Sequence, residues 1–185
     1  MNYVDSHAHL DDIRFDNNIE EVIKRAKEND VKYILNPSDS RESLSKVKKI
    51  AELFEIVYFA WGIHPNNIKS FTEEVTLMIQ QEKNNTKLKA IGEVGLDFYR
   101  NVDNKKLQEN IFREFIELAL SLELPIIIHS RESDKRMHEI LKSYFDGSKL
   151  YGVWHCFSGD KKLAFKVIDN GFVLGFCGNI TYKNS

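Results

Sequence analysis

The chain has 185 residues, of which 42% are hydrophobic and 29% are charged, a composition typical of one globular domain with a single core. Its 26 basic and 28 acidic side chains give a formal net charge of −2. This balance excludes a strongly cationic nucleic-acid-binding module, so any anion must be bound at a local site. We expect a single domain over residues 1–185.

Cysteine usage and hydropathy indicate the compartment. The two cysteines, Cys156 and Cys177, are too few for a disulfide framework and favour a reduced, intracellular protein in which both pack as small hydrophobes. The first residues lack the basic and apolar regions of a signal peptide. No apolar run approaches the roughly 18 residues that a membrane span needs. We therefore expect a cytoplasmic protein with no membrane association, and no protein partner is implied.

Short apolar segments rich in β-branched and aromatic residues alternate with amphipathic segments along the chain. The predicted strands cover residues 3–6, 31–35, 56–61, 89–94, 125–129, 152–155 and 172–176. The predicted helices cover residues 17–29, 40–54, 72–81, 104–122, 133–145 and 161–170. Ser40 is a typical residue at a helix start, and Gly171 is typical of the position just after a helix end.

This strict alternation predicts a parallel sheet with right-handed crossovers. The continuous apolar run at residues 126–128 suits a sheet that is covered on both faces. Two α/β architectures fit, an open doubly wound sheet and a (β/α) barrel. The first predicted strand is not followed by a glycine-rich phosphate loop, which removes the main support for a nucleotide-binding open sheet.

The positions of the histidines favour the barrel. Five of the six histidines, and one glutamate, stand at or just after the carboxyl ends of predicted strands: His7, His9, His64, Glu93, His129 and His155. In a barrel these strand ends converge on one face, where active sites are built. The sixth, His138, lies inside a predicted helix and is expected to be solvated.

These residue types point to metal chemistry. Imidazoles bind zinc, iron, manganese or nickel, and a carboxylate can bridge two such ions. The i, i+2 spacing of His7 and His9 places both on one side of an extended strand end. Two ions about 3.5–4 Å apart can clamp the attacking and leaving oxygens of a displacement and ionise water near neutral pH. The sequence therefore predicts a hydrolase of phosphodiester or amide bonds that uses two divalent ions (Zn, Mg, Mn, Fe or Ni), with Glu93 as a catalytic residue.

Three further side chains have two interpretations each. His64 could cap or pack, or it could contact substrate. Arg131 and Arg100 could bind phosphate, or they could pair with Glu132 and Asp97.

Five motifs in order along the chain resemble the TatD family of metal-dependent deoxyribonucleases, within the amidohydrolase-like barrel group. They are VDSHAHL at residues 4–10, GIHP at 62–65, IGEVGLDFY at 91–99, PIIIHSR at 125–131 and HCFSG at 155–159. The resemblance implies a TIM barrel in which His7 and His9 hold one ion, His129 and His155 hold the other, and Glu93 bridges them. It also implies that His64 and Arg131 lie near the substrate phosphate. Members of the family typically cleave DNA and some act on other substrates, so the resemblance favours DNA without fixing the substrate.

The family pattern continues beyond residues 178–182 to a later Glu-Thr-Asp-x-Pro segment that this sequence does not contain. In the family its Asp is a further ligand to the first ion and the expected base for the attacking water. A complete barrel also needs eight strands and typically ~250 residues. We therefore expect an incomplete barrel of about seven strands, truncated at its C-terminus and lacking the last strand and helix.

Three functions remain open at this stage. The first is a deoxyribonuclease that cleaves phosphodiester bonds by in-line attack of water. The second is an amide or ester hydrolase on the same scaffold. The third is an inactive remnant, in which the unpaired edges of the first and seventh strands favour self-association.

Overall fold

The computed structural model describes residues 2–145 and 149–183, which form seven parallel strands in the order in which they occur in the chain. The strands are β1 (Tyr3–Asp5), β2 (Val31–Pro37), β3 (Val57–Trp61), β4 (Leu88–Asp97), β5 (Ile126–Arg131), β6 (Gly152–Trp154) and β7 (Phe172–Leu174). The α-helices are α1 (Ile19–Glu28), α2 (Arg41–Leu53), α3 (Glu73–Gln81), α4 (Lys105–Leu122), α5 (Asp134–Phe145) and α6 (Lys161–Ile168). Short 3-10 helices are η1 (Ile13–Phe15), η2 (Pro65–Ser70), η3 (Val102–Asn104) and η4 (Gly178–Thr181).

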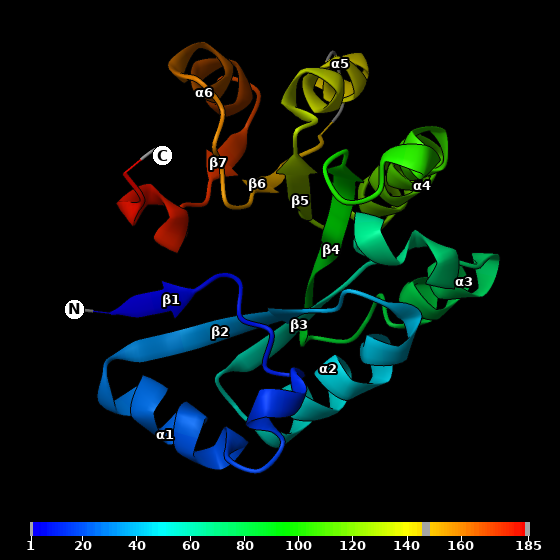
Figure 1. Cartoon of the computed structure of the whole chain (residues 1–185). Helices are drawn as coiled ribbons and strands as arrows, with labels where there is room; N and C mark the ends of the chain where they lie inside the picture. The colour runs from blue at the N-terminus through cyan, green and yellow to red at the C-terminus, as the bar shows by residue number, and fades with distance from the viewer. Residues whose placement is uncertain (1, 146–148, 184–185) are drawn as a thin grey trace.

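The sheet curls into an incomplete barrel with the helices on its outer side (Figure 1). β1 and β7 border the opening, and in the described part of the chain they are not paired with each other. This confirms the predicted α/β barrel class with seven strands, and it excludes the doubly wound alternative, because strand order follows chain order without a reversal.

The main core lies between the outer face of the sheet and the helices. Phe59, Ile91 and Ile128 from the strands pack there with Phe112 and Phe115 of α4, and all five are at most 1% exposed. A much smaller apolar cluster covers the inner face of the sheet, formed by Ala60, Ala90 and Ile127 with Leu35 and Val153 at its border. β5 is therefore covered on both faces, as its continuous apolar run predicts, and residues 126–128 are at most 1% exposed.

Local signals at the helix ends act as expected. Ser40 accepts a hydrogen bond from the backbone amide of Ser43, whose own side chain accepts from the amide of Ser40, so that α2 begins with a capping box. α6 ends at Ile168, two residues earlier than predicted, so Gly171 lies three residues beyond its last residue; its φ of 85° is a conformation that favours glycine.

Two strands at the site extend further than predicted. β4 continues to Asp97, so Glu93 lies within the strand and not at its end. β5 continues to Arg131, which likewise places His129 inside it. The apolar runs end earlier than the strands, but backbone pairing continues, for example between Gly95 and His129. A strand continues through polar residues where their backbone groups pair with the neighbouring strand. The hydropathy pattern of the sequence does not record this pairing.

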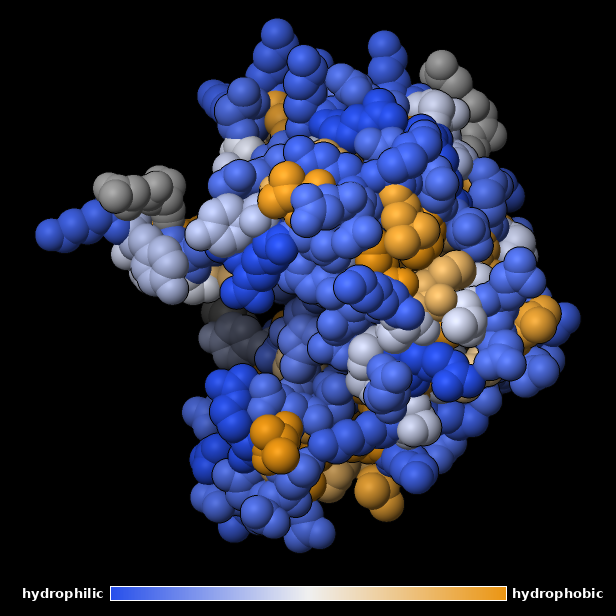
Figure 2. Space-filling view, turned by 45° about the vertical axis from the view of Figure 1, so that its right-hand side comes forward, coloured by the Kyte–Doolittle hydropathy of each residue, from blue (hydrophilic) through white to orange (hydrophobic). Residues whose placement is uncertain are grey.

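No helix in the described residues is both long and apolar enough to cross a membrane. The face of the molecule shown in Figure 2 is predominantly hydrophilic, and its apolar side chains occur in small separate groups.

Candidate metal centre

The carboxylate of Glu93 lies at the centre of the candidate site, where the residue is 3% exposed. One carboxylate oxygen, Oε2, is 3.2 Å from Nε2 of His7 and 3.7 Å from Nε2 of His9. The other oxygen, Oε1, is 2.9 Å from Nδ1 of His129. The two oxygens of one side chain therefore face different imidazoles, which is the arrangement of a carboxylate that bridges two ions.

The backbone of β4 departs from regular pairing at this point. The register between β4 and β5 shifts between Ile91 and Val94, on either side of Glu93. Gly95 has a φ of 146°, and a Cβ built there would lie closer than 3.0 Å to the carbonyl oxygen of His129. Glycine is therefore needed for β4 and β5 to approach closely where Glu93 and His129 meet.

The first ligand group has the dimensions of a metal site. Nε2 of His7, Nε2 of His9 and Oε2 of Glu93 form a triangle with edges of 3.1, 3.2 and 3.7 Å. In a tetrahedral site with metal–ligand bonds of about 2.0–2.1 Å, neighbouring ligand atoms are about 3.3 Å apart. Two imidazoles and a carboxylate thus form one face of a tetrahedron that fits a divalent transition metal.

The second group of potential ligand atoms combines Glu93, His129 and His64. Nε2 of His64 is 3.1 Å from Nδ1 of His129. However, Nδ1 of His64 accepts a hydrogen bond of 3.0 Å from the backbone amide of Asn66, so this nitrogen carries no proton. Burial lowers the pKa of His64 to about 4, so the ring is neutral at pH 7 and its only proton is on Nε2.

His64 therefore presents an N–H group and not a lone pair to the site. This excludes it as a metal ligand in the observed conformation and suits it to donate a hydrogen bond to a substrate oxygen. Both interpretations of His64 from the sequence fit the structure, because the side chain also caps the start of η2.

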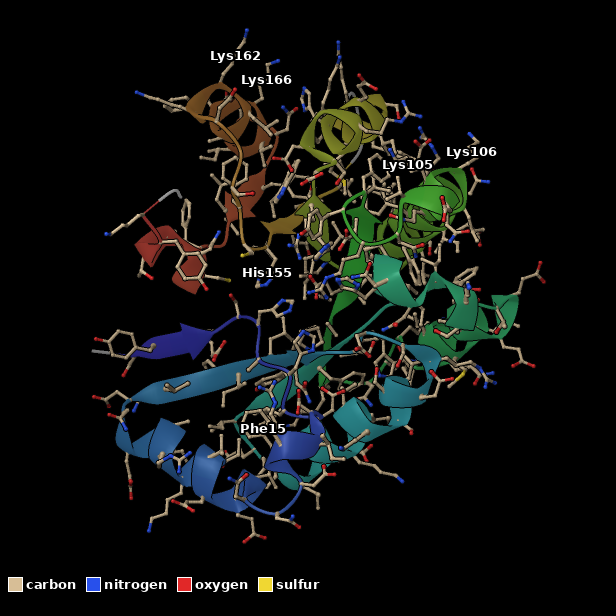
Figure 3. All side chains as sticks on the ribbon, in the orientation of Figure 1. Phe15, Lys105, Lys106, His155, Lys162 and Lys166 are labelled. Carbon is tan, nitrogen blue, oxygen red and sulfur yellow. The ribbon has the colours of Figure 1, made fainter. Side chains whose placement is uncertain are left out.

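His155 comes from the segment just after β6. Its ring stacks on the ring of His7, with centroids 3.5 Å apart, and its Nε2 is 3.8 Å from Sγ of Cys177. Figure 3 shows His155 between β6 and the segment that follows β1. Burial and the neighbouring His7 lower the pKa of His155 to about 4, which leaves the ring neutral and able to bind a metal. In this conformation the ring of His155 lies against His7 of the first ligand group.

The buried groups shift one another's charge states. Burial alone would raise the pKa of Glu93, but hydrogen bonds from His129, His7 and His9 hold it well below its usual value. The hydrogen bond to Glu93 raises the pKa of His9, against the effect of burial. The carboxylate is therefore ionised at neutral pH, as a metal ligand must be.

These side chains line an open cavity of about 710 Å³. Its charged lining, apart from the histidines, is Asp11, Asp12, Asp39, Glu93, Arg14 and Arg100. Four carboxylates against two guanidinium groups leave the described lining with two net negative charges. Four lysines labelled in Figure 3 lie on the outer surface of α4 and α6, away from His155.

The predicted phosphate contacts are placed differently from each other. Arg100 lines the cavity, whereas Arg131 is not among the described lining residues and stacks its guanidinium on Tyr99, 4.1 Å from the ring centroid. Asp97 accepts hydrogen bonds from the backbone amides of Tyr99 and Arg100. His138, which we expected to be solvated, is partly buried near the ring of Phe145.

Two residues at the site, Asn66 and Asp97, were not predicted to have a role there. Asn66 donates through its backbone to His64 and through its side chain to Asp97. Asp97 is 1% exposed and lies 3.5 Å from Nε2 of His129. A signal for Asp97 was present, because residues four apart in a strand share a face, and Asp97 is four residues after Glu93.

Comparison with known proteins gives a consistent result. A family described as TatD related DNase matches residues 4–185. An uncharacterised metal-dependent hydrolase of Buchnera aphidicola is 36% identical to this chain, and the match covers 100% of this chain and 73% of the relative's length. The uncharacterised metal-dependent hydrolase YabD of Bacillus subtilis is also 36% identical, over 98% of this chain and 71% of its own.

Solved structures agree in fold. The crystal structure of YjjV, a TatD homologue from Escherichia coli, superimposes with a TM-score of 0.90 at 29% identity, covering 99% of this chain and 71% of its own. An uncharacterised amidohydrolase from Saccharomyces cerevisiae superimposes with a TM-score of 0.82 over 94% of this chain and 67% of its own, but at 19% identity it supports the fold alone.

Proposed function

The chain belongs to the TatD related DNase family of metal-dependent hydrolases, and on that premise we propose that it cleaves phosphodiester bonds in DNA with two divalent ions. The observation that carries the proposal is the division of Glu93 between two ligand groups, with Oε2 toward His7 and His9 and Oε1 toward His129. In the proposal His155 completes the second group.

The ions would supply Lewis acidity and a water that ionises near neutral pH. The protein supplies the rest. His7, His9 and His129 would hold the ions as ligands beside the negative charge of Glu93. His64 would donate its Nε2 proton to a phosphate oxygen of the substrate. We place Arg131 at the edge of the phosphate path, and the position of Arg100 in the cavity lining supports a contact there as well.

Electrostatics give the proposal a second support. The described cavity lining has two net negative charges without ions, which would repel a polyanion. Two divalent cations would reverse this to two net positive charges. DNA binding itself, and not only cleavage, is therefore proposed to depend on metal. Cys156 and Cys177 are free thiols, which fits the proposal that the protein acts in the reducing cytoplasm.

The test is cleavage of single-stranded DNA by protein loaded with Mn²⁺ or Zn²⁺ and checked for bound metal. We expect cleavage that EDTA abolishes, loss of cleavage in Glu93→Gln, and no change in the surface control Glu139→Gln. A peptide amide and a carboxylic ester are assayed on the same sample. If either compound is hydrolysed while DNA stays uncleaved, the amide or ester hydrolase replaces the nuclease proposal. If metal-loaded protein turns over none of the three substrates, the chain is an inactive remnant.

A further inference from the structure

The two ring nitrogens of His129 face two different carboxylates. Nδ1 points to Oε1 of Glu93 at 2.9 Å, on the side of the proposed ions. Nε2 is buried and points to Oδ2 of Asp97 at 3.5 Å, and no described residue offers it a closer hydrogen-bond partner. Nδ1 of His129 therefore faces the proposed ions, and the carboxylate that Nε2 faces on the other side of the ring is that of Asp97.

Asp97 is fixed in place more firmly than a surface carboxylate. Its Oδ1 accepts from the backbone amides of Tyr99 at 3.0 Å and Arg100 at 2.8 Å, and its Oδ2 accepts from Nδ2 of Asn66 at 3.1 Å. Its own amide donates to Gln108 at 2.8 Å. These hydrogen bonds fix both carboxylate oxygens of Asp97 in place.

We propose that Asp97 is a positioning residue that holds the Nε2 proton of His129, so that the lone pair of Nδ1 is left for the metal. A histidine that binds metal through one nitrogen commonly donates from the other to a carboxylate, which fixes its tautomer and makes it a stronger ligand. The inference deepens the proposed metal centre and rests on it.

The variant Asp97→Asn tests the tautomer, because the surroundings dictate how the new amide must lie. Two backbone amides donate to the position of Oδ1, so the amide oxygen must stay there and the NH₂ group must take the place of Oδ2. Oδ1 of Asn66 is buried without a partner among the described residues, so the Asn66 amide can turn and accept from this NH₂. The variant therefore fits without a lost hydrogen bond.

The NH₂ group would then face Nε2 of His129 as a donor. It would favour the tautomer of His129 that has a lone pair on Nε2 and a proton on Nδ1. This proton would occupy the nitrogen that must bind the metal. In the metal-free protein that proton keeps a partner, because it can be donated to Oε1 of Glu93, while the Nε2 proton of His64, 3.1 Å from Nδ1, must turn to the open cavity. Metal binding is opposed directly, which separates positioning from a general structural role.

The experiment measures Zn²⁺ affinity and stoichiometry by competition with a chromogenic chelator, together with thermal unfolding of the metal-free protein. We expect Asp97→Asn to weaken one of the two bound ions by about 10- to 100-fold and to leave the metal-free unfolding temperature close to wild type. Asp16→Asn, which removes an exposed carboxylate paired with Lys46, is the control and should bind as wild type does. Unchanged affinity in Asp97→Asn would overturn the proposal.

A measurement on the wild-type protein keeps the proposal testable if Asp97→Asn does not fold. In ¹⁵N-labelled, Zn²⁺-loaded protein, His129 should show a slowly exchanging proton on Nε2 and a metal-shifted Nδ1. A proton on Nδ1 in the loaded protein would refute the assignment. Neither readout involves DNA, so an absence of DNA cleavage would contradict the nuclease proposal and leave this inference unaffected. Wild-type protein that binds no Zn²⁺ would overturn both the metal centre and this inference.

Discussion

The substitution Gly95→Ala tests whether the close approach of β4 and β5 places His129 against Glu93. Gly95 combines two demands that only glycine meets here, a φ of 146° and a Cβ position that lies within 3.0 Å of the His129 carbonyl oxygen. Backbone strain of this kind costs about 1–3 kcal/mol. Forcing an extra methyl group into a packed contact costs about 1–3 kcal/mol more. Near the middle of these ranges the loss is about 4 kcal/mol, or roughly 8–16 °C in Tm for a chain of this size.

Two other glycines separate the contributions. Gly171 has a φ of 85° with no atom within 4 Å of the Cβ position, so Gly171→Ala carries the conformational cost alone, about 1 kcal/mol. Gly178 has open space and no such φ, so Gly178→Ala should be close to neutral. The assay is thermal unfolding of the three variants, followed by Zn²⁺ affinity. If Gly95→Ala unfolds at the same temperature as Gly171→Ala and binds Zn²⁺ normally, the tight contact does not determine the position of His129.

Three further predictions follow from the site and its surroundings. Zn²⁺ at 100 times its Kd should raise the free energy of unfolding by about 2.7 kcal/mol for each ion bound, and EDTA should remove this gain; equal Tm values with and without EDTA would contradict metal binding. Burial lowers the pKa of His64 and His155 from 6.5 to about 4, so the unfolded chain binds more protons in that interval. The stability of the metal-free protein should therefore fall as the pH drops from 6.5 toward 4, against the opposite contribution of His9, and urea unfolding at pH 7 and pH 5 measures the slope. Arg136→Ala removes a two-bond contact to Glu109 that joins α5 to α4, and should cost about 1 kcal/mol in urea unfolding, whereas the exposed Lys142→Ala should cost less than half of that.

Much of the fold follows from the sequence because hydropathy and turn chemistry act locally. Each strand and α-helix among the described residues begins within three residues of its predicted start, and Ser40 and Gly171 mark helix ends for reasons visible in the chain itself. The extensions of β4 to Asp97 and of β5 to Arg131 were not predicted. They depend on pairing between two strands more than thirty residues apart in the sequence, which local patterns do not record.

The candidate site shows a similar division. The structure places His7, His9, Glu93 and His129 close together, because the carboxyl-terminal halves of the parallel strands converge on one face of the barrel. Their role as metal ligands stays a prediction. Position along the chain does not say which nitrogen of a histidine is available. His64 and His129 lie at the same edge of the sheet, yet different groups stand behind their rings. A backbone amide donates to Nδ1 of His64 and leaves its proton on Nε2. In our proposal the carboxylate of Asp97 behind His129 leaves the lone pair of Nδ1 for an ion.

Asn66 connects these two opposite outcomes. Its backbone amide sets the tautomer of His64, and its side chain donates to Asp97, which faces His129. One residue thus contacts both the group that we assign to the substrate and the support of a proposed metal ligand. Because the two contacts use different atoms, side-chain and backbone effects can be separated: Asn66→Ala deletes only the bond to Asp97. If the two histidines are set independently, this variant should weaken Zn²⁺ binding less than Asp97→Asn does and leave the hydrogen bond to His64 intact. A loss in Asn66→Ala as large as that in Asp97→Asn would instead mean that Asp97 orients His129 only while Asn66 holds it in place.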